Sequence, residues 1–219
     1  MYSRFFKRFL DFILSLTALI VLFPILLILT VIGAFAMKGN PFFVQPRPGK
    51  KGKNGKERIF KLIKLRTMSN AKDKEGNLLP DEVRLNKYGR FLRSTSLDEL
   101  PELLNILKGD MSVVGPRPER KVLADEICKE VPEFDYRLKV RGGLTGYAQI
   151  YGKYNTSSYD KLRLDLMYIE NYSLLLDIKL IILTLRIIFS KDSTEGIDVA
   201  AENQKKAEAL LQEAEGEKE

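Results

Sequence analysis

The sequence contains no histidine, no tryptophan and a single cysteine, Cys128. Without histidine the commonest general base is excluded, so any acid–base chemistry must use Asp, Glu, Lys or Tyr. A single cysteine excludes an intrachain disulfide and any zinc site built from several cysteines. The absence of tryptophan removes one of the two aromatic residues that usually anchor proteins at a membrane interface, although tyrosine is present.

The chain has 219 residues, with 36 Lys and Arg against 29 Asp and Glu, and a net charge of +7. This length suits one domain with a small appendage, and it can bury a sizeable core. The basic balance favours anionic partners, which include phosphates, nucleic acid and acidic lipid surfaces.

A long apolar run extends from Phe12 to Met37 without a charged residue. A membrane-spanning helix needs about 20 such residues, and soluble domains rarely expose a run of this kind. A cleaved signal peptide is an alternative, because basic residues precede the run and Ala34-Phe35-Ala36 imitates a cleavage site. The apolar part of a signal peptide is usually about 7–15 residues, so this alternative is disfavoured.

Pro24 lies near the middle of the run and predicts a kink, because proline removes a backbone donor and clashes with the preceding turn. Basic residues flank both ends: Arg4, Lys7 and Arg8 before the run, and Lys38, Arg47, Lys50, Lys51 and Lys53 after it. Positive charge favours the cytoplasmic side of a membrane. A straight span would satisfy only one flank, so we predict that residues 1–38 form a re-entrant membrane helix.

The rest of the chain predicts an α+β fold, with a small cytoplasmic domain over residues 39–197. Two β-like runs, 42–45 and 58–67, predict a short β-hairpin. The residues between them, Pro46-Arg47-Pro48-Gly49 and a Gly/Lys-rich stretch, are expected to form a long basic loop. Residues 70–88 are polar and are expected to form a loop. Helices are predicted at 101–107, 119–129 and 160–170, and a short strand is predicted at 144–150.

A second apolar run, Leu174 to Phe189, is interrupted by charges and is too short to span a membrane comfortably. It predicts either an amphipathic helix on the membrane surface or a buried core helix, and the sequence leaves both open. Residues 198–219 form a charged tail with seven acidic residues and three lysines. This tail is expected to bind a partner or to support self-association.

The most informative stretch is Ser96-Leu97-Asp98-Glu99-Leu100-Pro101. Ser96 and Glu99 fit the capping-box pattern, and acidic residues at a helix start are favoured by the helix dipole, so a purely structural role is one interpretation. Pro101 prefers the first helical position, which would leave both carboxylates in the preceding turn. There they can face one site, whereas inside a helix they would diverge by about 100°.

Cationic residues accompany this pair. They are Lys61, Lys64, Arg66, Arg93, Arg117 and Arg141. Arginine suits bidentate phosphate binding, but any one of these side chains is ordinarily a solvated surface charge, so the set matters only if several converge on the carboxylates. Arg117 lies between two prolines that hold its backbone extended, which either positions a ligand contact or forms a plain connecting loop.

An ordered set of motifs runs from Met1 to about Lys191. It comprises Lys7-Arg8-x-x-Asp11, Pro24, Gln45-x-Arg47-Pro48-Gly49, Phe60-Lys61-x-x-Lys64-Leu65-Arg66-Thr67-Met68, Leu92-Arg93-x-x-Ser96-Leu97-Asp98-Glu99-Leu100-Pro101, Lys108-Gly109-Asp110-Met111-Ser112, Val114-Gly115-Pro116-Arg117-Pro118, Leu144-Thr145-Gly146-x-Ala148-Gln149 and Asp165-x-x-Tyr168. The set resembles the bacterial monotopic phosphoglycosyl transferases, the small bacterial sugar transferase group. The order of the motifs, more than any single one, carries the resemblance.

The resemblance implies transfer of a sugar-1-phosphate from a UDP-sugar to a polyprenol phosphate, usually undecaprenyl phosphate, with release of UMP. Such a step begins the assembly of an exopolysaccharide, capsule, O-antigen or glycoprotein. The resemblance implies that Asp98 is the nucleophile and forms a covalent phosphosugar. It implies that Glu99 holds Mg²⁺ or helps to deprotonate the acceptor, with Asp98 and Glu99 as the metal ligands.

The resemblance also implies further roles and partners. Arg93 would bind phosphate and Arg117 the nucleotide, and the remaining positions expected near the phosphate and nucleotide are Lys64, Arg66, Arg141 and Asp165. Arg141-Gly142-Gly143 departs from the Arg-Pro-Gly common in the family, which loosens this turn. The expected location is the bacterial inner membrane, with the catalytic domain on the cytoplasmic face. The expected partners are membrane lipids and, for the tail, a second copy or pathway glycosyltransferases, and no nucleic acid.

A competing hypothesis is a non-catalytic, membrane-anchored basic module that binds anionic lipid or nucleic acid. It predicts that Asp98 and Glu99 are dispensable caps and that binding weakens steeply with salt.

Overall fold

The computed structural model describes residues 5–52, 54–152 and 156–189. The charged tail predicted at 198–219 lies outside the described residues, as does the end of the domain predicted at 39–197. Helices predominate in the described part, and two small sheets accompany them. This confirms the mixture of helix and strand predicted from the sequence.

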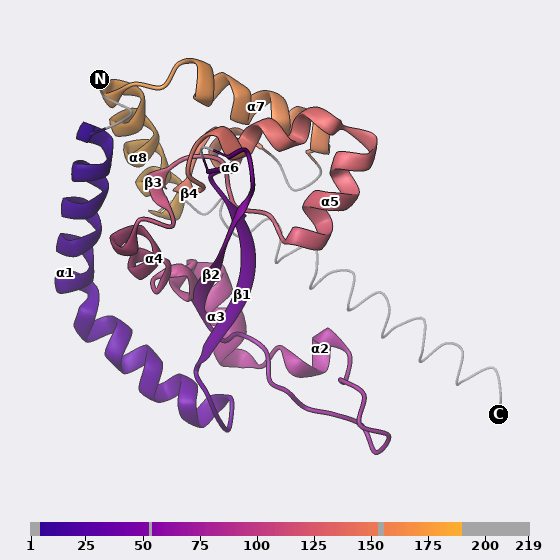
Figure 1. The fold of residues 1–219 in the computed structure, drawn as a ribbon. Coiled ribbons are helices and arrows are strands. Elements are labelled where there is room, and N and C mark those ends of the chain that lie inside the picture. Colours follow the sequence, from indigo (N-terminus) through magenta and orange to yellow (C-terminus); the bar gives the residue numbers. More distant parts are fainter. Residues whose placement is uncertain (1–4, 53, 153–155, 190–219) are drawn as a thin grey trace.

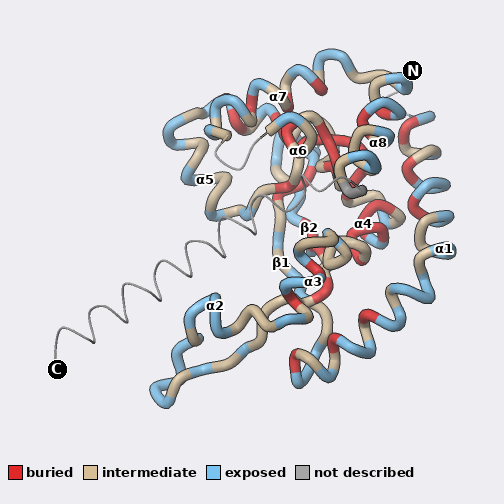
Figure 2. Tube along the Cα trace, turned by 180° about the vertical axis from the view of Figure 1, so that it is seen from behind, coloured by how far each residue is buried: buried red, intermediate tan, exposed pale blue. Residues whose placement is uncertain are grey.

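The N-terminal apolar run forms α1, Lys7–Ala36, a helix of 30 residues that contains Pro24. Among the described residues it is the one helix long and apolar enough to cross a membrane. It lies along one edge of the molecule and bends along its length (Figure 1). Its outer face is largely exposed (Figure 2). The long apolar helix is thereby confirmed, whereas a kink caused by Pro24 and a re-entrant path stay predictions.

The predicted hairpin is confirmed, but residues 46–49, expected in the loop, belong to the first strand, and the second strand ends at Leu65 rather than at residue 67. β1, Phe42–Gly49, pairs antiparallel with β2, Arg58–Leu65. Side chains of a strand alternate between its two faces, so Lys64 lies on the same face as the buried Phe60 and Leu62. The hairpin thus carries a lysine towards the interior at the end of an apolar row.

Residues 66–108 fold into a loop followed by short helices: α2 (Asp81–Arg84), α3 (Lys87–Thr95), the 3₁₀ helix η2 (Leu97–Glu99) and α4 (Glu102–Lys108). The helix predicted at 101–107 is confirmed, and it ends at Gly109, which has a φ of 91°. The expectation of a loop throughout 70–88 is wrong for α2 and for the start of α3. There Asn86 caps α3, its side-chain oxygen accepting a hydrogen bond from the backbone N–H of Gly89.

The next segment contains β3 (Ser112–Val114), α5 (Lys121–Glu130), the 3₁₀ helix η3 (Pro132–Lys139), β4 (Gly143–Thr145) and α6 (Tyr147–Tyr151). β3 and β4 pair in parallel. The strand predicted at 144–150 is wrong over its second half, because the chain turns into α6 after Gly146. The helix predicted at 119–129 is confirmed as α5.

The last described elements are α7 (Ser158–Glu170), which confirms the helix predicted at 160–170, and α8 (Leu174–Phe189). Burial of one face supports the core interpretation of α8, whereas its position at a membrane surface stays a prediction. Leu180 is fully buried in the core, whereas Leu175 is 79% exposed on the opposite side. An apolar side chain this exposed is consistent with a helix that lies at a membrane surface.

The core joins α1 to the rest of the molecule. Leu19 and Leu22 of α1 pack against a cluster built on Phe60, Leu103 and Ile106. Buried polar contacts reinforce this packing at the N-terminal end of the helix. Lys7 Nζ donates to Asp177 Oδ2 over 2.6 Å, Asp11 Oδ1 accepts from the Ser112 hydroxyl and the Val113 N–H, and Arg8 donates to the carbonyls of Ile106 and Leu107 at the end of α4. These contacts fix α8, β3 and the end of α4 against the apolar helix.

Candidate active site

The two adjacent carboxylates lie in η2, directly before α4, as the position of Pro101 predicts. Ser96, at the start of this turn, has a left-handed backbone with a φ of 54°, and its side chain makes no capping hydrogen bond. The capping box that Ser96 and Glu99 could form is therefore absent. Asp98 and Glu99 are left to make contacts with other parts of the molecule.

Lys64 of β2 lies among three carboxylates. Its Nζ is 2.7 Å from Glu99 Oε1, 3.2 Å from Glu102 Oε1 and 3.8 Å from Asp98 Oδ2. Glu102, in the first turn of α4, is buried, and its contact with a cation is the ion pair of Oε1 with Lys64. Sequence analysis missed this third acid because a glutamate in the first turn of a helix is ordinarily a dipole-stabilised surface residue.

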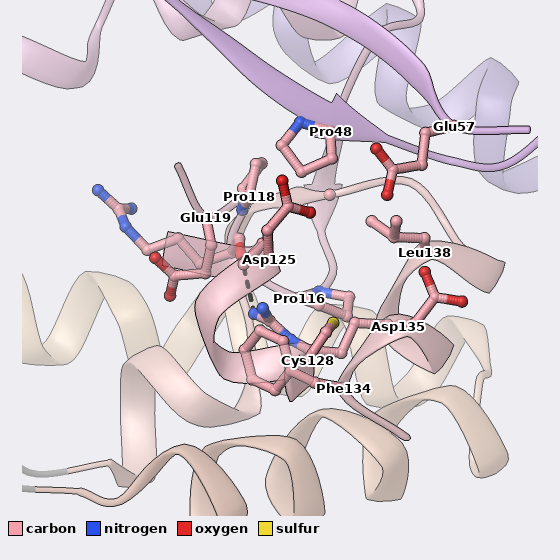
Figure 3. A pocket seen from close by; sticks show the side chains of 14 residues that line it. Pro48, Glu57, Pro116, Pro118, Glu119, Asp125, Cys128, Phe134, Asp135 and Leu138 are labelled. Carbon is pink, nitrogen blue, oxygen red and sulfur yellow. Dashed lines mark hydrogen bonds between the residues drawn. The ribbon is translucent and has the colours of Figure 1, made fainter. Parts of the chain in front are cut away.

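Arg117 approaches Glu99 from the other side, and both of its terminal nitrogens donate to the two carboxylate oxygens of Glu99. The turn that carries Arg117 is held from behind, because Arg137 donates through Nη2 to the Arg117 carbonyl at 2.8 Å. Figure 3 shows Pro116 and Pro118 of this turn beside a small cavity that Phe134 and Cys128 also line. The two prolines thus present one guanidinium to one carboxylate.

These contacts set the protonation of the acids. Burial alone would raise the pKa of Glu99, but the charges and hydrogen bonds of Arg117 and Lys64 lower it to about 2. Burial and the negative charge of Glu99 raise the pKa of Glu102 to about 7. Burial also raises the pKa of Asp98, which Lys64 only partly opposes. Glu99 is therefore an anion at neutral pH that is held by two cations, whereas Asp98 has only the longer ion pair with Lys64, at 3.8 Å.

Asp98 and Glu99 border a polar cavity of about 460 Å³ between the hairpin and α3. Its cationic lining consists of Arg47, Lys64, Arg66, Arg84 and Arg93. Of the positions predicted from the sequence, the structure therefore brings together Lys64, Arg66, Arg93, Asp98 and Glu99. A set of arginines around one cavity is suited to bidentate binding of phosphate groups.

Arg47 and Arg84 were not among the predicted site residues. Arg47 belongs to the Gln45-x-Arg47-Pro48-Gly49 motif. Its Nη1 donates to the Pro118 carbonyl at 2.9 Å, and this hydrogen bond links the hairpin to the turn that holds Arg117. Arg84 lies in a polar stretch that offers no sequence signal.

Two predicted positions lie elsewhere. Asp165 is buried in α7, where its Oδ2 accepts from Arg137 Nε at 2.6 Å, so it supports the Arg117 turn indirectly. Arg141 donates through Nε to the Gly109 carbonyl. Neither residue lines the polar cavity, and a contact of either with a nucleotide stays a prediction.

The described residues contain no larger set of metal-binding side chains. No cluster of three or more His, Cys, Asp and Glu side chains with the spacing of a metal site occurs among residues 5–52, 54–152 and 156–189. The carboxylates that border the polar cavity are Asp98 and Glu99, and the closest cation to Asp98 is Lys64 at 3.8 Å.

Comparison with known proteins agrees with this geometry. Residues 2–191 match the family model described as bacterial sugar transferase. The chain belongs to the bacterial sugar transferase family. The resemblance drawn from the ordered motifs is thereby confirmed, and the match covers every residue of the site described above.

Three relatives illustrate the family. The uncharacterized sugar transferase EpsL of Bacillus subtilis (strain 168) is 46% identical over 175 residues, which cover 80% of each chain. The UDP-glucose:undecaprenyl-phosphate glucose-1-phosphate transferase of Klebsiella pneumoniae is 40% identical over 184 residues, 82% of this chain and 39% of that protein. The UDP-N-acetylgalactosamine-undecaprenyl-phosphate N-acetylgalactosaminephosphotransferase of Aeromonas hydrophila is 33% identical over 191 residues, 85% of this chain and 44% of that protein. The chain thus spans less than half the length of the last two.

Proposed function

We propose that this sugar transferase moves a sugar-1-phosphate from a UDP-sugar to undecaprenyl phosphate and releases UMP, as an early step of bacterial glycoconjugate synthesis. The observation that carries the proposal is the Asp98–Glu99 pair at the border of a cavity lined by four arginines and a lysine. The named activities of the Klebsiella and Aeromonas relatives, which act on undecaprenyl phosphate, agree with it.

The polar cavity is suited to the diphosphate of the donor. Arg66 and Arg93 hold their positions with single hydrogen bonds, to the Phe42 carbonyl and to the Thr67 hydroxyl. The remaining guanidinium N–H groups can therefore bind phosphate oxygens. Spreading the donor's negative charge over several arginines reduces the repulsion that an attacking carboxylate would meet.

Asp98 is the proposed nucleophile. One of its carboxylate oxygens attacks the phosphorus that carries the sugar, the bond from that phosphorus to the bridging oxygen breaks, and UMP leaves with the electron pair. In a second step an oxygen of undecaprenyl phosphate attacks the same phosphorus, and the Asp98 carboxylate departs. The acceptor oxygen is already anionic, so this step needs little help from a base, in keeping with a sequence that has no histidine.

Asp98 rather than Glu99 suits this role. Glu99 is held by Arg117 and Lys64, and attack would require it to break both ion pairs. Asp98 has one cation, at 3.8 Å. Glu99 instead orders Lys64 and Arg117, so that their positive charges lie beside the reacting phosphorus.

Magnesium fits the donor set. In phosphoryl-transfer sites Mg²⁺ is commonly held by one or two carboxylates together with substrate phosphates, which agrees with the adjacent carboxylates of Asp98 and Glu99 at the border of the polar cavity. Asp98 and Glu99 would hold it. When bound, the ion would neutralise charge on the phosphate oxygens.

The test is UMP release by purified protein in detergent with Mg²⁺, undecaprenyl phosphate and a panel of UDP-sugars. We expect release with one or two sugars, and we expect Asp98→Asn to lower the rate by at least about a thousandfold, because the amide cannot act as a nucleophile. Asp125→Asn is the matched control, since Asp125 is a largely exposed acid of α5 that pairs with Lys121.

Two outcomes would contradict the proposal. Full activity of Asp98→Asn would exclude Asp98 as the nucleophile and indicate direct transfer between the two substrates. Failure of every donor, together with salt-sensitive binding to anionic vesicles, would instead support a non-catalytic basic module.

A further inference from the structure

A second cavity adjoins Glu99, and its walls come from elements other than the hairpin. It has a volume of about 530 Å³, and most of its lining is apolar. Leu22 of α1, Leu103 of α4 and Ile181 of α8 contribute to its walls. It therefore lies between the two helices whose outer faces carry exposed apolar side chains, such as Ile20 on α1 and Ile182 on α8.

The apolar groove and the polar cavity meet at the same residues. Ser96 and Glu99 line both, and Arg117 lines the groove on the far side of Glu99. A molecule in the groove and a molecule in the polar cavity would thus reach the η2 turn by separate routes. One approach is apolar and adjoins the two apolar helices, whereas the other is lined with arginines.

Gln149 marks a polar point on the wall of this groove. It lies on α6 and lines the groove, and both the oxygen and the nitrogen of its side-chain amide are buried without a hydrogen-bond partner. A buried amide that lacks partners is costly, and such groups in folded proteins commonly await a ligand or a bound water. Other polar side chains that line the groove do have partners, since the hydroxyls of Thr145 and Thr184 share a hydrogen bond.

These observations select one occupant. A ligand that fills the groove must be apolar along its length, and at its polar end it must be anionic to suit Arg117 and able to accept from an amide N–H. A polyprenol phosphate has this chemistry. We propose that the first isoprene units of the acceptor occupy the groove between α1, α4 and α8, and that Gln149 donates its amide N–H to the acceptor phosphate. This inference rests on the proposed function and adds separate entrances for donor and acceptor.

The test separates the two half-reactions. Donor cleavage is measured as UMP released in a single turnover without acceptor, and acceptor transfer is measured as the loss of labelled sugar from the protein after undecaprenyl phosphate is added. We expect Gln149→Leu to leave the first rate within about threefold and to slow the second by at least about tenfold, because a hydrogen bond to a charged group is lost.

A groove-filling variant gives an independent measurement. Ile181→Trp should slow acceptor transfer and also reduce the preference for undecaprenyl phosphate over a two-isoprene phosphate. The bulky indole would exclude the isoprene chain of the acceptor from the groove. Ile182→Trp is the matched control, since Ile182 is the next residue of α8, is 60% exposed and does not line the groove. It should keep both the rate and the chain-length preference.

Several results would overturn the inference. Acceptor transfer that is unchanged in both variants would exclude the groove, and an equal loss of both half-reactions in Gln149→Leu would place this residue in a shared site. A chain-length preference that persists in Ile181→Trp would place the isoprene chain elsewhere. Absence of donor cleavage in the wild-type protein would instead contradict the proposed function itself.

Discussion

At the scale of single residues, the site depends on how negative charge is distributed around Lys64. Adjacent carboxylates followed by proline could be predicted to face one site, since proline fixes where the helix begins. The burial of Glu102 could not be predicted, because no local sequence signal shows that a glutamate in the first turn of a helix will be buried. The contact of Asp165 with Arg137 could not be predicted for the same reason, because it joins two elements, α7 and η3, that are separate in the sequence.

Glu102 predicts a dependence of stability on pH. Its pKa is raised to about 7 in the folded protein, against an ordinary value of 4.5, so the folded state binds more protons than the unfolded state between these values. Stability should therefore fall as pH rises from about 4.5 to 7, by at most about 3 kcal/mol for this group. Glu102→Gln removes the ionisation and should gain stability relative to wild type above pH 7.

The measurement is thermal unfolding in detergent with a chelator present, at pH 5 and at pH 8. The melting temperature of Glu102→Gln should exceed that of wild type by more at pH 8 than at pH 5. Glu126→Gln, at an exposed position of α5, is the control and should follow wild type at both values. An equal difference at the two pH values would show that Glu102 does not titrate in this range.

At the scale of elements, local signals predict local structures. The hairpin and the helices α4, α5 and α7 follow from alternation, capping and proline or glycine signals within a few residues of each boundary. The parallel pairing of β3 with β4 does not, because each strand has three residues and about 30 residues separate them. The two strands can pair because their backbones approach closely at Gly115 and Gly143.

Gly143 offers a direct test of that approach. A Cβ at this position would lie 2.1 Å from the Gly115 nitrogen and 2.5 Å from its carbonyl oxygen, and backbone atoms cannot move aside cheaply. Gly143→Ala should therefore destabilise the protein by about 3 kcal/mol or more, an effect at the upper end of single substitutions. It should also reduce UMP release, because β3 leads directly into the turn that carries Arg117.

Gly39→Ala is the matched control, because a Cβ there meets nothing within 4 Å. Both variants would be compared by thermal unfolding and by UMP release. A Gly143→Ala protein as stable and as active as Gly39→Ala would show that the two strands do not approach this closely.

At the scale of the whole molecule, the exposed apolar surface and the charged site belong to different elements. The outer face of α1 is exposed, as Figure 2 shows, and α8 carries exposed apolar side chains such as Leu175. The charged site is built instead from the hairpin, α3 and η2. The length of the apolar run predicts the helix, and the ordered motifs predict the family. The apolar groove could not be predicted, because its walls come from helices far apart in sequence, such as α1 and α8, whose residues Leu22 and Ile181 both line it.

The path of α1 through the membrane is the last prediction. Basic residues on both flanks and Pro24 in the middle predict that both ends of the helix face the cytoplasm. In a Cys128→Ser background, single cysteines at Ser3 and Gly39 should both resist a membrane-impermeant maleimide added to intact cells and should both react after permeabilisation. Gly39 is a suitable position because a side chain there meets open space. Labelling of Ser3→Cys in intact cells, with Gly39→Cys protected, would establish a straight span instead, and the same pair in a Pro24→Ala protein would show whether the proline sets the path.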